Sequence, residues 1–245
     1  FFFPVDFSFL CFCPVMIVIE RPQTDPWYNI AAEEYLLKSK YDDLFMLWQN
    51  QPSVIVGKHQ NTLAEINYHY LRKNRIPVIR RITGGGTVYH DMGNLNFTFI
   101  QKGEKGKLVD FRRFIDPVIE ALKQMGLNAR FEEKNNIMIN GYKVSGNSEH
   151  VYKNRVIHHG TLLFSSDLDR LEEAIRVSEE KYHDRSVKSI RTRVANIKEF
   201  LPKPVTIEAF RDSITAFFMK RNKGSVIISL SKEDVQNIQK LAASK

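Results

Sequence analysis

Short apolar runs alternate along the chain with longer segments of helical periodicity. Residues 44–49 (LFMLWQ) and 53–57 (SVIVG) predict two strands separated by a turn at residues 50–52. Residues 94–100 (NLNFTFI) alternate polar with apolar side chains, which is typical of a half-buried strand. The mixture predicts an α+β fold in which mixed β-sheets are flanked by helices.

Helices are expected where a capping residue precedes an amphipathic run. Asp25 and Pro26 suit the N-cap and first position of a helix that continues through Leu37. Leu63, Ile66 and Tyr70 lie three and four residues apart and predict one helix over 63–75. Further helices are expected over 109–125 before Gly126, after Ser165 and Ser166, from Thr206, and in the tail from Ser231.

The first fifteen residues, FFFPVDFSFLCFCPV, are unlike the rest of the chain. They are apolar, but they are interrupted by Pro4, Asp6 and Pro14 and are too short to span a bilayer. We therefore expect residues 1–15 to be a non-native or upstream extension, with natural translation starting at Met16. A catalytic domain is expected over 16–201, followed by a helical extension over 202–245 that begins a truncated accessory domain.

Both cysteines, Cys11 and Cys13, lie in this N-terminal segment. The rest of the sequence has no thiol, which excludes disulfides, cysteine zinc sites and cysteine nucleophiles there. A reducing, cytoplasmic location is expected.

The net charge of +8 comes from 36 basic and 28 acidic residues, and it favours an anionic partner such as a nucleotide, a nucleic acid or an acidic protein. Charge alone does not choose among these. A basic segment is interpreted either as a solvated surface loop or as a loop that closes over phosphates or docks an acidic acceptor. It contains Lys181, Arg185, Lys188, Arg191 and Arg193.

Three consecutive glycines, Gly84, Gly85 and Gly86, lie between the predicted strands at 77–81 and 87–90. Glycines permit positive φ angles and leave backbone N–H groups uncovered, so the run could surround an anion, although a flexible hairpin turn is the simpler interpretation. Arg80 and Arg81 directly before it supply cationic groups that suit a phosphate or carboxylate. Neither the Walker A pattern nor the Rossmann glycine pattern fits.

The run RRITGGGTVYHDMGNLNF at 80–97 resembles the signature loop of the lipoate-protein ligase A family, within the wider biotin and lipoate ligase fold. Three other segments resemble the family in order and spacing. They are YNIAAEEYLL at 28–37, PSVIVGKHQN at 52–61 and NGYKVSGNSEHVYKNRVIHHGTLLF at 140–164. The resemblance extends from Met16 to about Leu201 and implies a biotin/lipoate ligase-like catalytic domain.

The resemblance also implies roles for particular residues. Arg81 would contact the activated acyl-phosphate region, and Lys143, the expected catalytic residue, would touch both lipoate and the α-phosphate. A strand lysine is costly to bury unless it faces an anion, although without the resemblance a solvent-facing lysine is the simpler interpretation. The remaining ATP- and lipoate-binding candidates are Gly84, Gly85, Gly86, Thr87, Val88 and Tyr89, with His90, Asn135, Asn136 and His159 as further candidates.

Two of these candidates bear on metal binding. His158 and His159 are adjacent in a strand and point to opposite faces, so they do not grip one ion; one is expected in the core and the other beside the acyl pocket. Asn136 occupies a position where many family members carry Asp, which removes an anionic ligand for Mg²⁺. Mg²⁺ is expected with ATP, and its ligands are not predicted.

The function implied is that of an ATP-dependent ligase, which converts lipoate to lipoyl-AMP, releases pyrophosphate and transfers the lipoyl group to an acceptor lysine. The implied partners are lipoyl domains of 2-oxo acid dehydrogenase complexes, the glycine-cleavage H protein and a separate C-terminal accessory protein. No nucleic acid or membrane partner is expected.

A transferase that uses preformed lipoyl-AMP stays open. Octanoyl and lipoyl transferases of this fold use a cysteine that is absent after Met16, and a biotin ligase carries a GRGR-type loop where this chain has RRITGGGT. A basic module that binds nucleotides or nucleic acid is disfavoured by the scattered charges.

Overall fold

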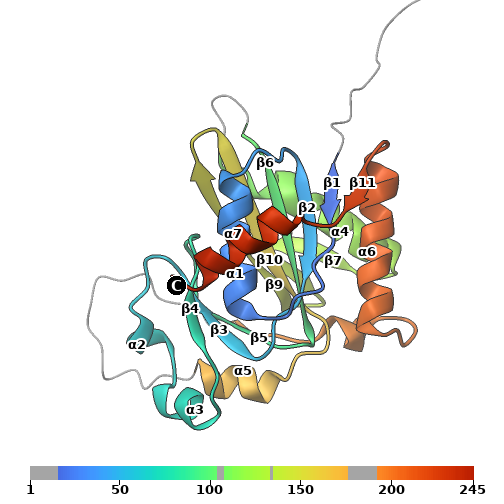
Figure 1. The fold of residues 1–245 in the computed structure, drawn as a ribbon. Helices are drawn as coiled ribbons and strands as arrows, with labels where there is room; N and C mark the ends of the chain where they lie inside the picture. Colours follow the sequence, from blue (N-terminus) through green and yellow to red (C-terminus); the bar gives the residue numbers. More distant parts are fainter. Residues whose placement is uncertain (1–15, 104–107, 133–134, 176–191) are drawn as a thin grey trace, which may run out of the picture.

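The large sheet is the centre of the molecule. The computed structural model describes residues 16–103, 108–132, 135–175 and 192–245 (Figure 1). Eight strands form one mixed sheet, which confirms the predicted α+β class. In spatial order they are β11 (Val226–Ile228), β1 (Ile17–Ile19), β2 (Leu44–Trp48), β6 (Asn94–Lys102), β10 (Arg155–Leu163), β9 (Tyr142–Tyr152), β8 (Asn136–Ile139) and β7 (Ala129–Glu132). β1 runs parallel to both neighbours, whereas the other pairs are antiparallel.

A second sheet of three strands carries the glycine run. It consists of β4 (Val78–Arg80), β3 (Ser53–Val56) and β5 (Val88–His90), in that order. β4 is parallel to β3 and β5 is antiparallel to it, so β4 and β5 lie on opposite edges of β3. The interpretation of a simple hairpin turn was therefore wrong: residues 81–87, which we call the glycine loop, must cross the end of β3.

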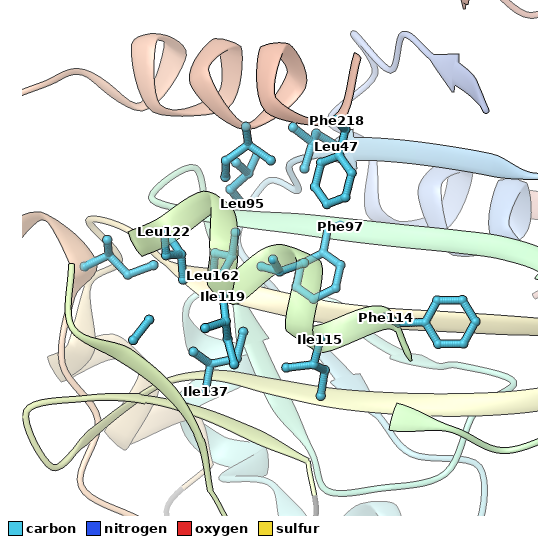
Figure 2. Packing of buried hydrophobic residues seen from close by; sticks show 14 of the residues in the cluster. Leu47, Leu95, Phe97, Phe114, Ile115, Ile119, Leu122, Ile137, Leu162 and Phe218 are labelled. Atoms are coloured by element: carbon cyan, nitrogen blue, oxygen red, sulfur yellow. The ribbon is translucent and has the colours of Figure 1, made fainter. Parts of the chain in front are cut away.

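Helices cover both faces of the large sheet. On one face α4 (Phe111–Gln124) and α6 (Ile207–Arg221) pack into the main apolar core, which includes Phe97, Phe114 and Phe218 (Figure 2). On the other face α1 (Pro26–Lys38) and the small sheet share a second core, and α7 (Lys232–Ala242) lies over α1. Shorter helices are α2 (Thr62–Glu65), α3 (Tyr68–Lys73), α5 (Leu168–Ala174) and the 3₁₀ helix η1 (Ile197–Phe200).

The predicted helix over 63–75 is two helices. The first ends at its C-cap Ile66, and Asn67 caps the second, because its side chain accepts a hydrogen bond from the backbone N–H of Tyr70 at 3.2 Å. Ile66 lies between them and is buried, whereas Leu63 is 51% exposed. The three-and-four spacing there did not reflect one continuous apolar face.

Strand β6 is buried on both faces, so its prediction as a half-buried strand was wrong. Asn94, Asn96 and Thr98 are buried like the apolar residues between them. These polar side chains are buried because α1 and the small sheet cover the face of the large sheet on which they lie. Their hydrogen-bonding groups are thereby placed beneath the cavity described below.

Residues beyond 201 pack on the same body as the predicted catalytic domain. Phe210 and Phe218 of α6 belong to the main core, and β11, which the sequence did not predict, extends the large sheet. Tyr35 and Tyr41 donate hydrogen bonds to the Asp234 carboxylate at 2.8 Å each and fix the start of α7. The accessory domain expected from residue 202 stays a prediction. No helix in the described ranges is long and apolar enough to cross a membrane.

Candidate active site

A cavity of about 390 Å³ lies between the glycine loop and the large sheet. Such a volume suits a small-molecule ligand. Ten of the twelve predicted site residues line it, from both sheets and the segments between them. They are Arg81, Gly85, Gly86, Thr87, Val88, His90, Asn135, Asn136, Lys143 and His159.

The other two predicted residues lie differently. Tyr89 follows Val88 in β5, so its side chain points to the opposite face and packs with Val56 and Leu71 in a separate apolar cluster. Gly84 contributes its carbonyl, which accepts hydrogen bonds from Arg81 Nη2 at 2.5 Å and Ser148 Oγ at 3.0 Å. The structure therefore does not bring the Tyr89 side chain to the cavity, and Gly84 braces the loop.

Arg81 holds the glycine loop together from within. Its Nη2 donates to the carbonyls of Gly84 and Gly86, its Nη1 donates to the Ile55 carbonyl at 3.0 Å, and its Nε donates to Thr83 Oγ1 at 2.9 Å. These bonds use four of the five N–H groups of a guanidinium. Burial lowers the pKa of Arg81 to about 10, so it stays cationic at neutral pH. Its main contribution is to shape the loop and to place a positive charge beside the cavity.

A second set of hydrogen bonds supports the glycine loop from outside. Arg80 Nη1 donates to the carbonyls of Gly57 and Gln60 at 2.7 and 3.0 Å. The Gln60 side-chain oxygen accepts from Thr87 Oγ1 at 2.9 Å and from the Gly57 N–H at 3.0 Å. Gly57, Lys58 and Gln60 are not among the lining residues and support the glycine loop from behind.

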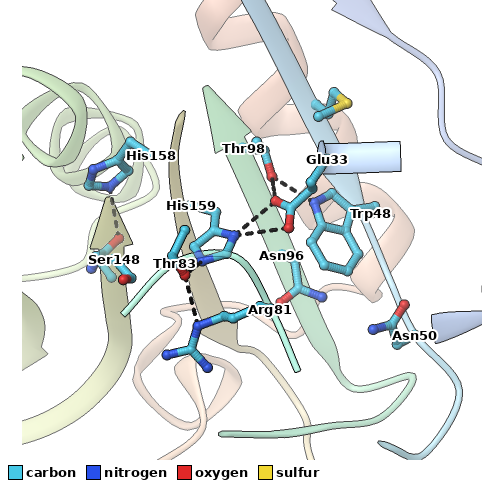
Figure 3. Close-up of polar contacts among 12 residues, drawn as sticks. Glu33, Trp48, Asn50, Arg81, Thr83, Asn96, Thr98, Ser148, His158 and His159 are labelled. Atoms are coloured by element: carbon cyan, nitrogen blue, oxygen red, sulfur yellow. Dashed lines mark hydrogen bonds and ion pairs between the residues drawn. The ribbon is translucent and has the colours of Figure 1, made fainter. Parts of the chain in front are cut away.

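Glu33 was not predicted, yet it anchors the hydrogen-bond network beneath the cavity (Figure 3). Its Oε1 accepts from His159 Nδ1 at 2.9 Å and from Thr98 Oγ1 at 2.6 Å, and Trp48 Nε1 donates to Thr98 Oγ1 at 2.9 Å. His159 Nε2 lies 2.8 Å from Thr83 Oγ1, so the network continues to the glycine loop. A carboxylate on the buried side of a helix is rare, so the position of Glu33 in the predicted helix could have indicated a functional residue.

The pKa of Glu33 is lowered despite its burial. Burial raises the pKa, but the charge of His159, hydrogen bonds from His159 and Thr98, and the charge of Arg21 together outweigh it. Glu33 is therefore ionised at neutral pH and fixes the orientation of His159. The adjacent His158 is fully buried and His159 lines the cavity, so one histidine lies in the core and one at the cavity. That His159 borders the acyl group stays a prediction.

His90 is a neutral, buried imidazole at the cavity. Asn50 Oδ1 accepts from Asn29, so the Asn50 amide nitrogen faces His90 Nδ1 at 3.1 Å, and the His90 proton must lie on Nε2. Burial, followed by the charges of Arg81 and His159, lowers the pKa of His90 to about 3.

This lowered pKa predicts acid sensitivity. Below about pH 6.5 the unfolded chain binds a proton at His90 that the folded chain rejects, so stability is complete above that pH and falls as the pH drops towards 3. The contribution lost between about pH 6.5 and about pH 5 is ~2 kcal/mol. Urea unfolding should show a smaller loss over this interval for His90→Asn, which cannot titrate. An equal loss in both proteins would contradict the assignment.

Lys143 lies in β9, which pairs with β8, the strand that begins at Asn136. Its backbone N–H donates to the Arg193 carbonyl at 2.9 Å, and its carbonyl accepts from Ala195 at 3.2 Å, so residues 193–195 hold this part of the strand. Its Cε and Nζ lie 3.3 Å from the point where a Gly146 Cβ would stand. The absence of a side chain at Gly146 leaves room for the ammonium group over the cavity wall.

The predicted basic segment falls mostly outside the described residues, which exclude Lys181, Arg185, Lys188 and Arg191. Arg193 is described, and its guanidinium lies 5.7 Å from the Tyr142 ring centre.

Metal binding by the protein does not fit the described residues. They contain no group of three or more His, Cys, Asp or Glu side chains able to hold an ion, and no carboxylate is among the cavity-lining residues. Mg²⁺ prefers oxygen ligands, often carboxylates together with substrate phosphates.

The α+β fold and the cavity with cationic lining define a domain suited to an anionic small molecule. Residues 25–219 match the family model described as "Lipoyl protein ligase A/B catalytic domain", and the chain therefore belongs to this family. It is 43% identical over 227 residues to lipoate–protein ligase 1 of Staphylococcus aureus, covering 91% of this chain and 68% of that protein.

Two solved structures are similar in fold. One is part of a bipartite lipoate-protein ligase system with its E2 lipoyl domain from Thermoplasma acidophilum, with 26% identity, a TM-score of 0.78, and coverage of 94% of this chain and 92% of that chain. The other is lipoate-protein ligase A bound with ATP, with 25% identity, a TM-score of 0.79, and coverage of 94% and 95%.

Proposed function

We propose that the chain activates lipoate with ATP and transfers the lipoyl group to a lysine of an acceptor protein. The observation that carries this proposal is the placement of Lys143, the Arg81 charge and the glycine loop around one cavity. Membership of the ligase family and the relative bound with ATP support it.

Activation overcomes a chemical obstacle. A carboxylate does not acylate an amine directly, because oxide or hydroxide is a poor leaving group. In the proposed first step a lipoate carboxylate oxygen attacks the α-phosphorus of ATP, a C(O)O–P bond forms, and the bond to the β-phosphate breaks. Pyrophosphate leaves with the electron pair of that bond, and lipoyl-AMP remains.

The cavity residues suit stabilisation of that step. Negative charge would accumulate on the α-phosphoryl oxygens, and the Lys143 ammonium and the backbone N–H groups of Gly85 and Gly86 would donate to them, because all three residues line the cavity. A preorganised donor of this kind contributes about 3 kcal/mol to transition-state stabilisation. Arg81 would act mainly by holding the loop carbonyls so that the N–H groups keep their direction.

In the proposed second step the amine of an acceptor lysine attacks the acyl carbon of lipoyl-AMP. A C–N bond forms, the C–O bond to AMP breaks, AMP takes its electron pair, and the amine loses a proton. Lipoyl domains of 2-oxo acid dehydrogenase complexes and the glycine-cleavage H protein are the proposed acceptors. The Thermoplasma acidophilum system, which pairs a bipartite ligase with an E2 lipoyl domain, supports the first class.

A second candidate is a transferase that uses preformed lipoyl-AMP and needs a separate accessory protein for activation. The observation that favours it is the similarity to a bipartite ligase, over 94% of this chain and 92% of that chain.

One experiment separates the candidates. The purified chain is incubated with ATP and lipoate, and pyrophosphate release and lipoyl-AMP are measured. A parallel sample receives synthetic lipoyl-AMP and a lipoyl domain. The ligase predicts lipoyl-AMP in the first sample and acylation in the second, the transferase predicts acylation in the second alone, and the absence of both products would overturn both candidates. Replacing lipoate by octanoate in each sample measures the preference for the acid.

A further inference from the structure

A second buried chain of polar groups lies behind the cavity wall, separate from the Glu33 network. His158 and Glu149 face each other across strands β10 and β9, and His158 Nδ1 lies 2.8 Å from Glu149 Oε1. His158 Nε2 lies 3.2 Å from Asn147 Oδ1, and Asn147 lines the cavity. These hydrogen bonds therefore connect the Glu149 carboxyl group through the His158 imidazole to the Asn147 amide at the cavity.

The orientation of Asn147 fixes the proton positions. Its Nδ2 lies 2.9 Å from the backbone carbonyl of Asn135, which only accepts, so Nδ2 donates there and Oδ1 faces His158. His158 Nε2 must then carry a proton. A neutral imidazole has its Nδ1 lone pair towards Glu149, and the Glu149 carboxyl group must donate the second hydrogen bond.

The surroundings favour this neutral pair. Phe114 stacks on the His158 ring at 4.9 Å between centres and an angle of 24°, and Phe97 stacks at 6.0 Å. Burial, followed by the charge of His159, lowers the pKa of His158 well below its usual value. Burial is also the largest cause that raises the pKa of Glu149 to about 7.

Charged and polar neighbours of Glu149 modify that effect. The Asp110 backbone N–H donates to Glu149 Oε2 at 3.2 Å and lowers the pKa, the Asp110 charge raises it, and the Arg113 charge lowers it.

Gly160 provides the space that this arrangement needs. A Cβ at Gly160 would stand 2.1 Å from Asn147 Oδ1 and 2.5 Å from Phe97 Cζ, closer than real contacts allow. Gly160 lies opposite Asn147 in the β9–β10 pairing, so the glycine lets the amide oxygen reach His158.

The amide connects to the part of the site that contains Lys143. Asn147 and Asn135 are joined by three hydrogen bonds, from Asn147 N, Asn147 Nδ2 and Asn135 Nδ2, at 3.1, 2.9 and 2.5 Å. Asn135, Asn136 and Lys143 line the same cavity: Asn135 directly precedes β8, Asn136 begins it, and Lys143 lies in the neighbouring β9.

We propose that Glu149, His158 and Asn147 form a positioning chain that sets the Asn135 segment of the cavity for binding the nucleotide, with a neutral Nε2-protonated imidazole and a protonated carboxyl group. The assignment to the nucleotide rests on the proposed function. Glu149 and His158 touch no ligand; they act through Asn147.

A pair of Glu149 variants tests the positioning role. Glu149→Leu removes the donor to His158, and the dissociation constant for ATP should rise about tenfold, whereas that for lipoate should change less than about twofold. Glu149→Gln keeps a donor to Nδ1 and should restore ATP affinity. Calorimetry with each ligand measures these effects on folded protein without turnover.

The proton arrangement is measured independently in the wild-type chain. ¹⁵N-histidine NMR should show His158 protonated at Nε2 and unprotonated at Nδ1 between about pH 5 and about pH 6, where the Glu149 carboxyl group holds its proton. A doubly protonated or Nδ1-protonated His158 between about pH 5 and about pH 6 would overturn the proposal, as would equal weakening of ATP and lipoate binding in Glu149→Leu. Failure of the proposed function appears differently, as wild-type protein that binds ATP but forms neither lipoyl-AMP nor acylated acceptor.

Discussion

Lys143→Ala is expected to reduce the rate of lipoyl-AMP formation at least about 100-fold while the chain stays folded. The ammonium group reaches over Gly146 at the cavity wall, and its proposed role is to stabilise charge that develops on the α-phosphate. Losing one such donor costs about 3 kcal/mol in the transition state, or more than a hundredfold in rate. Single-turnover pyrophosphate release with ATP and lipoate measures the effect.

Lys198→Ala is the matched control. Lys198 is an exposed lysine on η1, away from the cavity-lining residues, so its removal should leave the rate within about twofold. Circular dichroism and thermal unfolding should show both variants folded. A folded Lys143→Ala protein that forms lipoyl-AMP at the wild-type rate would contradict the role given to Lys143.

Gly57→Ala is expected to reduce kcat/KM about 100-fold although Gly57 does not line the cavity. A Cβ at this position would stand 2.1 Å from the carbonyl oxygen of Gly85, so the backbone of the glycine loop must move. A displacement of about 1 Å in a catalytic constellation is enough for a hundredfold loss. Steady-state kinetics with ATP and lipoate tests this expectation.

Gly224→Ala separates loop displacement from a general loss of stability. Gly224 has a φ of +85°, which strains alanine, and it lies between α6 and β11. This variant should unfold at a lower temperature yet keep its kcat/KM within about twofold. If Gly57→Ala retains wild-type kinetics, the tight contact between residue 57 and the glycine loop does not control the site.

Local signals predicted the helices that carry their own caps. The Asp25 side chain accepts from the Tyr28 N–H at 2.7 Å, and Thr206 and Ser231 cap α6 and α7 in the same way. Gly126, with a φ of +84°, follows the end of α4 as expected. These features depend on residues a few positions apart, so the sequence alone is sufficient to locate them.

Features that depend on distant partners were missed. The alternation in β6 predicted one solvated face, but a helix from residues 26–38 and the small sheet cover that face, and Thr98 bonds Glu33 across 65 positions. The glycine run resembled a hairpin because the sequence does not reveal that β3 separates β4 from β5. Long-range strand order is set by the whole core.

The candidate site shows the same division. The resemblance to the ligase family pointed to Lys143 and most of the glycine loop, which line the cavity. It also included Tyr89, although the alternation of side chains along a strand directs Tyr89 away from the cavity. Glu33 and the pairing of Glu149 with His158 depend on the registers of β9 and β10 and on the docking of α1. A single sequence does not encode these pairings in a form that can be read locally.

A crystal structure with a non-hydrolysable lipoyl-AMP analogue tests the central claim most directly. The analogue should occupy the cavity beneath the glycine loop, with Lys143 Nζ at roughly 3 Å from an oxygen that replaces one on the α-phosphate. An analogue bound elsewhere, or a Lys143 ammonium directed to bulk solvent and away from that group, would contradict the proposed activation step.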